Sequence, residues 1–272
     1  MIAIPQVTIT GRGQTTLSLH MGSHPGLPTP INLPRLGAAI ALIAALIAPV
    51  VVTLWVSTPD VSDVQVRVAS LTKSYGVELL KPGQVPTTLA EAVVATEDER
   101  FYSHHGIDTV GLARAGAYDL ANRCLCQGGS TITQQLVKQL YLNGSDRGYN
   151  KVVDMMLALK VEAVLSKQQI MADYLSEIPT GANRYGVVDA ACTYFGRPLD
   201  QLTLGQYALL AGVAQSPSIY DPTVNPSAAQ SRRADVLNDM VSESYITPAQ
   251  AAAAKAEPVI IVRGADPASC QA

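Results

Sequence analysis

The sequence predicts a mainly α-helical domain that follows a single membrane-spanning helix. Residues 36–56 form an uncharged, almost wholly apolar run, and a helix needs about 20 such residues to cross a bilayer. From Pro86 onward, polar capping residues recur just before apolar stretches, which is the pattern of consecutive helices. Only 15% of the 272 residues are charged, against about 25% in soluble domains. This low share of charged residues is consistent with both the membrane-spanning helix and an apolar helical domain.

The N-terminal segment, residues 1–35, is rich in Pro, Gly, Ser and Thr and is expected to be a disordered tail. It carries Arg12 and Arg35 and no acid, whereas acids follow the apolar run. Because basic flanks tend to stay in the cytoplasm, we expect a cytoplasmic tail, a single-pass anchor at residues 36–56 and an extracytoplasmic remainder. A cleaved signal peptide is the alternative, although its apolar core would span only about 7–15 residues.

The outer part divides into a linker at residues 57–83, a helical domain at residues 84–241 and an Ala-rich C-terminal tail at residues 242–272 that is expected to add little. The linker holds the strand signal, an alternating stretch at residues 64–71. Helix starts are expected at the capping boxes Thr88-x-x-Glu91, Thr131-x-x-Gln134, Ser166-x-x-Gln169 and Thr203-x-x-Gln206, and at Pro226 and Pro248.

A further buried helix is expected over residues 151–165. Its apolar positions are Val152, Met155, Met156, Leu159 and Val161. The same stretch places Lys151, Asp154, Ala158 and Glu162 along one face. Such a polar stripe is either a solvated face or the lining of a cleft.

An acidic segment, ATEDERFYSHHGID, places Glu97, Asp98 and Glu99 together, ahead of His104. If the preceding helix continues to Phe101, these acids lie near its C-terminus and oppose the helix dipole. A carboxyl in that position has a raised pKa, which suits a general base. A solvated acidic turn is the alternative.

A glycine-rich segment, QGGSTITQQLVKQLYL, joins a turn to a helix start. Gly128 and Gly129 allow close backbone approach. Free N–H groups at Ser130 and Thr131 could receive an anion, and Lys138 lies two turns further along. An ordinary flexible turn is the alternative.

The acidic segment, the glycine-rich segment and the stretch from Asn150 onward follow one another along the chain. In this order and spacing they resemble the peptidoglycan glycosyltransferase domain of glycosyltransferase family 51, in its monofunctional biosynthetic transglycosylase type. The family's E-D-x-x-F-x-x-H-x-G motif is matched by Glu97, Asp98, Phe101, His104 and Gly106. Its G-G-S-T-[IL]-T-Q-Q motif is matched by residues 128–135, and its R-K-x-x-E motif lies over residues 150–154. Later segments agree in order, among them Tyr174-Leu175, Tyr185-Gly186, Tyr194-Phe195-Gly196, Leu210-Ala211-Gly212, Gln215-Ser216-Pro217-Ser218 and Arg232-Arg233.

The resemblance implies a lysozyme-like, mainly helical fold that polymerises lipid II into β-1,4-linked glycan strands and releases undecaprenyl pyrophosphate. Glu97 would be the general base on the acceptor's 4-hydroxyl, with inversion at the donor's anomeric centre, and Asp154 takes the place of the second family carboxylate. The leaving pyrophosphate would be met by Lys138 and Lys151. The substrate-binding residues it implies are Asp98, Phe101, His104, Gly128, Gly129, Ser130, Thr131, Gln134, Gln135, Lys138 and Lys151.

No cofactor is expected to be required, although Mg²⁺ or another divalent cation assists some members of the family, and no metal cage is visible in the sequence. The expected partners are lipid II, the growing glycan strand and the membrane. Penicillin-binding transpeptidases are expected as further partners, because the residues after Met240 lack the S-x-x-K, S-x-N and K-T-G motifs of such enzymes. The net charge of −3 does not favour nucleic-acid binding.

The chain departs from the family pattern at a few positions. Asn150 replaces an Arg, Asp154 replaces a Glu that is longer by one methylene, Ser176 replaces an Asn, and Asn183 stands where a Gly is frequent. These departures keep a second hypothesis open, a weakly active or inactive lipid II-binding scaffold. A peptidoglycan-cleaving lysozyme relative would share the fold but not the GGSTITQQ string.

The four cysteines leave their pairing open. A bond between Cys124 and Cys126, two residues apart, would be strained. Cys192 is expected to pack inside a helix, and Cys270 could pair with Cys124 or Cys126. Free thiols are an equal alternative.

Overall fold

The computed structural model describes residues 33–124, 129–145, 147–181, 183–262 and 270. The chain divides into two compact units, residues 1–52 and 53–272. Helix α1 (Leu33–Ser57) begins in the first unit and contains the apolar run. Among the described residues, no helix combines the length and the apolar character that crossing a membrane requires.

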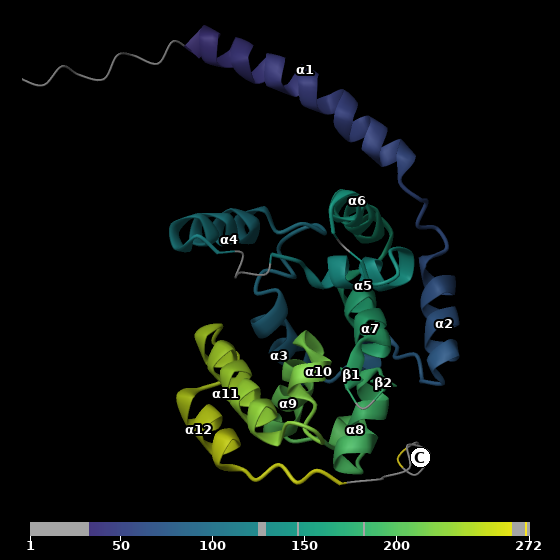
Figure 1. The fold of residues 1–272 in the computed structure, drawn as a ribbon, viewed down its shortest axis with the longest axis vertical. Coiled ribbons are helices and arrows are strands. Elements are labelled where there is room, and N and C mark those ends of the chain that lie inside the picture. Colours follow the sequence, from purple (N-terminus) through teal and green to yellow (C-terminus); the bar gives the residue numbers. More distant parts are fainter. Residues whose placement is uncertain (1–32, 125–128, 146, 182, 263–269, 271–272) are drawn as a thin grey trace, which may run out of the picture. The chain divides into compact units, whose positions relative to one another are not determined.

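The second unit is built almost entirely from helices, which confirms the mainly α-helical prediction (Figure 1). Its further α-helices are α2 (Val64–Tyr75), α3 (Thr87–Glu97), α4 (Thr109–Asn122), α5 (Ile132–Tyr141), α6 (Tyr149–Val164), α7 (Lys167–Glu177), α8 (Val187–Phe195), α9 (Leu204–Gln215), α10 (Pro217–Tyr220), α11 (Pro226–Ser242) and α12 (Pro248–Ala256). Two 3₁₀ turns, η1 (Pro82–Gln84) and η2 (Leu199–Gln201), and two short strands complete it.

Helix α9 forms the centre of the core. Its residues from Gly205 to Ala214 are all buried, as expected for a helix that is apolar on every side. Helices α3 and α11 pack against it, and Thr203 caps its start in the predicted capping box with Gln206. The end of α3 is therefore held by two packed neighbours.

Helix α5 packs against α6 and α7 and forms the second part of the core. The predicted Thr131–Gln134 capping box is confirmed. Ser166 caps α7 by accepting from the Gln169 N–H, but the box is incomplete because the Gln169 amide donates to Asp173 instead. The predicted buried face of α6 is only partly right. Val153, Leu157, Ala158 and Val161 are buried, whereas Val152, Met155 and Leu159 are half-buried.

Two local predictions are wrong. Residues 64–71 alternate like a strand but lie in helix α2, because Val64, Val68 and Thr72 are buried at a spacing of four and stabilise a helix against the core. The Thr88 capping box does not form either. Helix α3 starts at Thr87 after Pro86, with no side-chain cap, and it ends at Glu97 instead of continuing to Phe101.

A two-stranded antiparallel hairpin, β1 (Pro179–Gly181) and β2 (Arg184–Tyr185), was not predicted. It is too short to show an alternating pattern. Its turn uses positive backbone φ angles, 87° at Gly181 and 57° at Asn183. Asn adopts this left-handed region more readily than most residues, which explains how Asn183 stands where relatives often have Gly.

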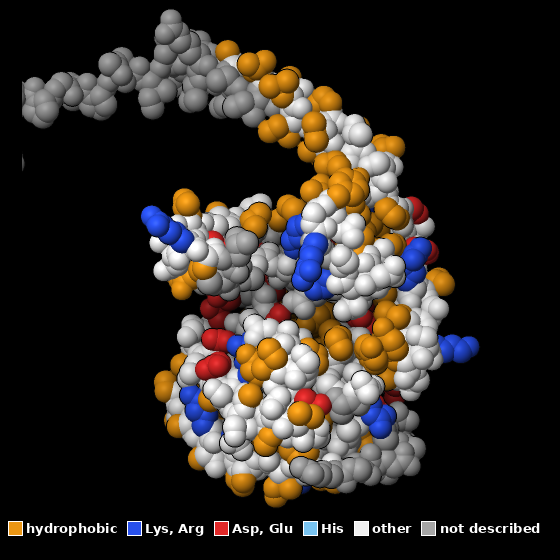
Figure 2. Space-filling model, in the orientation of Figure 1, with side chains coloured by type: hydrophobic (Ala, Val, Ile, Leu, Met, Phe, Trp, Pro, Cys, Tyr) orange, Lys and Arg blue, Asp and Glu red, His pale blue; other side chains and the backbone are white. Residues whose placement is uncertain are grey.

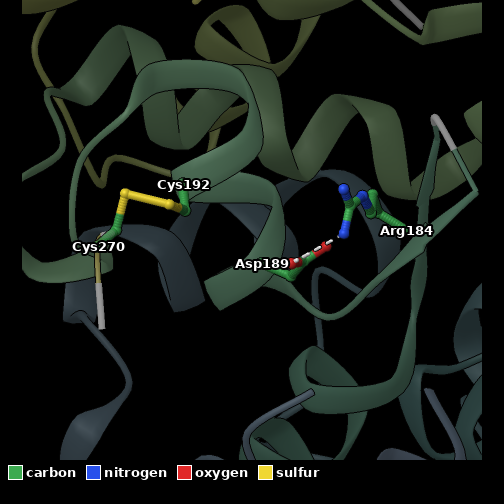
Figure 3. The surroundings of a disulfide bond; sticks show 4 residues. All are labelled: Arg184, Asp189, Cys192 and Cys270. Carbon is green, nitrogen blue, oxygen red and sulfur yellow. Dashed lines mark ion pairs between the residues drawn. A yellow bond between two sulfur atoms is a disulfide. The ribbon is translucent and has the colours of Figure 1, made fainter. Parts of the chain in front are cut away.

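The C-terminal segment contributes to the fold, although the sequence analysis treats it as a tail that adds little. In helix α12, Ala251 and Ala254 are buried, and α12 packs against α11. Cys270 forms a disulfide with Cys192 of α8 (Figure 3). The prediction that Cys270 pairs with Cys124 or Cys126 is therefore wrong, and Cys126 lies outside the described residues.

The chain just after α1 is fixed to α6 by one buried lysine. The Lys160 ammonium donates hydrogen bonds to the carbonyls of Thr58, at 2.9 Å, and Pro59, at 3.1 Å. The same ammonium lies 5.2 Å from the centre of the Trp55 ring. Three interactions of one buried cation thus hold the start of the second unit in place.

Candidate active site

The acidic, glycine-rich and α6 segments meet in one region, as their resemblance to a single site predicts. Glu97 is the last residue of α3, and Asp98 is its C-cap. The buried Asp98 carboxylate accepts from the Ile132 N–H at 3.0 Å and lies 2.9 Å from His104 Nε2. Thr131 Oγ1 also donates to the Gly106 carbonyl at 2.8 Å. These bonds join the acidic segment to the start of α5.

Two of the expected substrate-binding residues lie inside the protein. Phe101 is fully buried, and the Lys167 ammonium lies 4.3 Å from the centre of its ring. The His104 ring is almost completely buried between Asp98 and Glu162, whose Oε1 lies 4.0 Å from Nδ1. In this structure both side chains pack beneath the acidic segment and stabilise it.

Glu97 is a buried carboxyl with an asymmetric environment. Its side chain is 8% exposed. Oε2 accepts a hydrogen bond from Gln135 Nε2 at 2.7 Å, and Tyr174 donates to Gln135 Oε1 at 3.2 Å. Oε1 has no hydrogen-bond partner among the described residues, and its ion-pair contact is Arg232 Nη2 at 3.9 Å.

Burial raises the pKa of Glu97, and the hydrogen bond from Gln135 and the charges of Arg232 and Lys138 only partly oppose this rise. The raised pKa agrees with the direction expected from the sequence, but the main cause is desolvation and not the helix end. Lys138 lies further along α5 and is half-buried.

Asp154 lies in a second cluster, built from α5 and α6. Its side chain is 1% exposed. Oδ2 accepts from Gln134 Nε2 at 2.9 Å and from the Lys151 ammonium at 3.1 Å. Lys151 also donates to Ser130 Oγ at 2.7 Å. The polar stripe on α6 is therefore the lining of an internal cluster and not a solvated face.

A small cleft of about 110 Å³ opens beside Glu97, and Figure 2 shows acidic side chains around a hollow below α4. The lining residues are Thr96, Glu97, Asp98, Glu99, Arg100, Asp108, Gly111, Arg114, Gly129, Ser130 and Thr131. Gly128, the other predicted glycine, lies outside the described residues.

Six residues of this lining were not predicted as site residues, namely Thr96, Glu99, Arg100, Asp108, Gly111 and Arg114. Arg114 of α4 contacts Glu99 at 2.8 Å. The signal that could have found α4 is Asp108, which caps the helix by accepting from the Gly111 N–H. Arg232 was noted as part of a matching segment, but its position beside Glu97 was not predicted.

The described residues do not form a resident metal site. No group of three or more His, Cys, Asp or Glu side chains converges on one point among them. Asp98 already accepts from the Ile132 N–H and contacts His104, and the open oxygen of Glu97 faces a guanidinium.

A buried carboxyl at a helix end lies beside this cleft, and the chain belongs to the transglycosylase family. The family model described as Transglycosylase matches residues 65–241. That range begins in α2 and ends in α11.

Among the relatives, penicillin-binding protein 1A of Vibrio cholerae is 44% identical over 66% of this chain and 22% of its own length. A Cupriavidus necator protein named "Putative transglycosylase" is 41% identical over 65% of this chain and 76% of its own length. The crystal structure of penicillin-binding protein 1A from Haemophilus influenzae is similar at a TM-score of 0.43 and 25% identity, covering 69% of this chain and 18% of that one. The chain spans about a fifth of the length of the penicillin-binding proteins that it matches.

Proposed function

We propose that this protein is a peptidoglycan glycosyltransferase that polymerises lipid II into β-1,4-linked glycan strands and releases undecaprenyl pyrophosphate. The observation that carries the proposal is the Glu97 carboxyl, which is buried beside a cleft in a chain of the transglycosylase family. One of its oxygens is held by Gln135 and the other has no hydrogen-bond donor among the described residues.

Glu97 would take the proton from the 4-hydroxyl of the acceptor sugar. A hydroxyl is a weak nucleophile at neutral pH, so the attack needs a base within hydrogen-bond reach. The raised pKa of Glu97, caused by burial, makes its carboxylate a stronger base than an exposed glutamate. Gln135 fixes one carboxylate oxygen, Oε2, and the attack inverts the donor's anomeric centre.

The Lys151 cluster would stabilise the leaving group. A departing pyrophosphate gains negative charge and needs nearby cations. Lys151 is held by Ser130 and Asp154 at the side of the cleft. Asp154 would fix the lysine in place and be fixed itself by Gln134. Lys138 would supply a second cation. The N–H groups of Thr131 and Ile132, by contrast, already donate within the protein, to Gln134 Oε1 and Asp98 Oδ2.

We further propose that α1 anchors the protein in the cytoplasmic membrane with the catalytic domain outside. The uncharged run at residues 36–56 supports this location. The Cys192–Cys270 disulfide supports an extracytoplasmic position, because disulfides persist in oxidising compartments. Exposed apolar side chains on α4, of which Leu120 is 83% exposed, give the lipid-linked substrate a surface to contact.

Glycan cross-linking would come from penicillin-binding transpeptidases that act on the strands. Relatives of this chain are named as penicillin-binding proteins.

The test is incubation of the full-length protein, purified in detergent, with labelled lipid II. We expect a ladder of glycan chains on a denaturing gel and release of undecaprenyl pyrophosphate. The substitutions at residues 150 and 154 motivate a second outcome, in which lipid II binds at the concentrations used but no product longer than the monomer forms. That result would overturn the enzymatic proposal in favour of a lipid II-binding scaffold.

A further inference from the structure

Arg232 of α11 lies beside the open oxygen of Glu97. Its Nη2 is 3.9 Å from Glu97 Oε1, and the two side chains are 12% and 8% exposed. Nε and Nη2 of Arg232 and Oε1 of Glu97 are all buried without a hydrogen-bond partner among the described residues. A buried polar group without a partner destabilises a fold. The opposite charges of Arg232 and Glu97, 3.9 Å apart, reduce this cost by compensating for each other.

The fold makes room for Arg232 at this position. A Cβ atom on Gly212 of α9 would lie 2.9 Å from Arg232 Cγ, closer than such atoms normally approach. The glycine therefore lets the arginine stem pass between α9 and α11. The guanidinium carbon lies 5.9 Å from the centre of the Tyr220 ring. Elements on both sides thus direct the guanidinium toward the end of α3.

We propose that Arg232 is a positioning residue for Glu97, whose guanidinium orients the carboxylate and balances part of its charge. The proposal rests on the proposed function, because it assigns Glu97 the role of the base. Arg232 would hold Oε1 while Gln135 holds Oε2. Substrate would then meet a carboxylate that is fixed at both oxygens.

Other charged and titratable groups also face Glu97. Asp98 follows it in the chain, Lys138 faces it from α5 and Tyr174 from α7. Asp98 raises the pKa of Glu97, whereas Arg232 and Lys138 lower it, Arg232 more strongly. Removing Arg232 therefore raises the pKa of Glu97 further, and the base stays protonated up to a higher pH.

The experiment measures the pH dependence of kcat/KM for lipid II polymerisation in the wild type, Arg232→Met and Arg232→Lys. Loss of an opposite charge at this distance shifts a carboxyl's titration by about one pH unit or more. We expect the acidic limb of the Arg232→Met profile to move to higher pH by that amount. Activity then falls roughly 10-fold on the acidic side and recovers under alkaline conditions. Arg232→Lys should restore most of the limb.

Arg233 provides a matched control on the next residue. Its guanidinium donates to the carbonyls of Glu257 and Lys255 and so holds α12 instead of facing Glu97. Arg233→Met should lower the melting temperature and leave the acidic limb in place. If Arg232→Met does not fold, Arg232→Gln takes its place with the same expected shift.

A second readout is independent of turnover. Carboxyl ¹³C NMR of glutamate-labelled protein, with the Glu97 signal assigned by its loss in Glu97→Gln, follows the titration of Glu97 without substrate. An unchanged titration and an unchanged acidic limb in Arg232→Met overturn the proposal, even if activity drops. If the wild type makes no glycan but the Glu97 titration shifts, the proposed function fails and the Arg232 assignment stands.

Discussion

Two buried carboxylates, Glu97 at the end of α3 and Asp154 in α6, differ in how their charge is compensated. Oδ2 of Asp154 accepts from an amide and from the Lys151 ammonium at 3.1 Å. Glu97 accepts from one neutral amide, and a guanidinium lies at 3.9 Å from its other oxygen. A directly paired carboxylate is a weak base and a good anchor, whereas a loosely compensated one retains basicity. This difference supports the proposed roles, in which Glu97 takes the proton and Asp154 orders a cation.

Glu97→Gln should have the largest effect on turnover of the variants considered. The amide keeps the shape and can still accept from Gln135, but it cannot take a proton. We expect kcat to fall roughly 10²- to 10⁴-fold, while the protein still folds, because the amide keeps the hydrogen bond with Gln135. Glu91→Gln, on the same helix but outside the cleft lining, is the control and should keep its activity. Equal losses in both variants would contradict the assignment.

Removal of the disulfide should act on stability alone. Cys270→Ser opens a crosslink between residues 78 apart in sequence, and such a loss costs about 2–4 kcal/mol. Neither carboxylate contacts the bond, so the pH profile of polymerisation should not move. Chemical unfolding with and without reductant measures the first effect. A shifted profile would show that the far end of the domain influences the site.

Asp154→Asn tests the second carboxylate of the comparison, the one that is paired directly with a lysine. Asparagine can accept from Gln134 but cannot balance the charge of Lys151, so we expect a loss of about 1–3 kcal/mol in the free energy of unfolding. The loss of turnover should be smaller than in Glu97→Gln. Asp154→Glu, which introduces the residue of the family motif, should retain activity. If Asp154→Asn abolishes turnover at full stability, the two carboxyls share the chemical step.

Glu177 extends the comparison to a third buried carboxyl, one whose two oxygens lack hydrogen-bond partners among the described residues. Burial raises its pKa well above the usual range. The folded state therefore holds the proton more tightly than the unfolded chain, so this contribution to stability is present at acidic pH and is lost as the pH rises.

Glu177→Gln should consequently stabilise the protein at neutral pH by at least about 1 kcal/mol. The gain should vanish at a pH below the usual glutamate pKa, and activity should persist because Glu177 does not line the cleft. Urea unfolding at several pH values measures this difference. A constant effect across pH would contradict the raised pKa.

The features predicted from the sequence are those set by local interactions. Thr131, Ser166, Thr203 and Thr247 all cap helices by accepting from a backbone N–H three residues on, and this spacing is readable in a sequence. The acidic and glycine-rich segments could also be identified, because each is continuous along the chain.

The features that were missed depend on contacts between distant segments. Helix α2 forms because its residues spaced four apart are buried against the core, although the same residues alternate. Arg232 reaches Glu97 only because α11 packs on α9 at Gly212. The disulfide likewise joins Cys192 to Cys270, 78 residues apart in sequence, and the spacing of cysteines alone does not determine such a pairing.

Helix α6 joins two features that were described separately. Lys160 fixes the chain after α1 to one end of this helix, and Lys151 and Asp154 lie nearer its other end. A helix rises about 1.5 Å per residue, so the number of residues between Lys151 and Lys160 fixes the distance between these two positions along α6. The distance between the lysine-carboxylate cluster and the point where the chain enters the second unit is therefore set by α6.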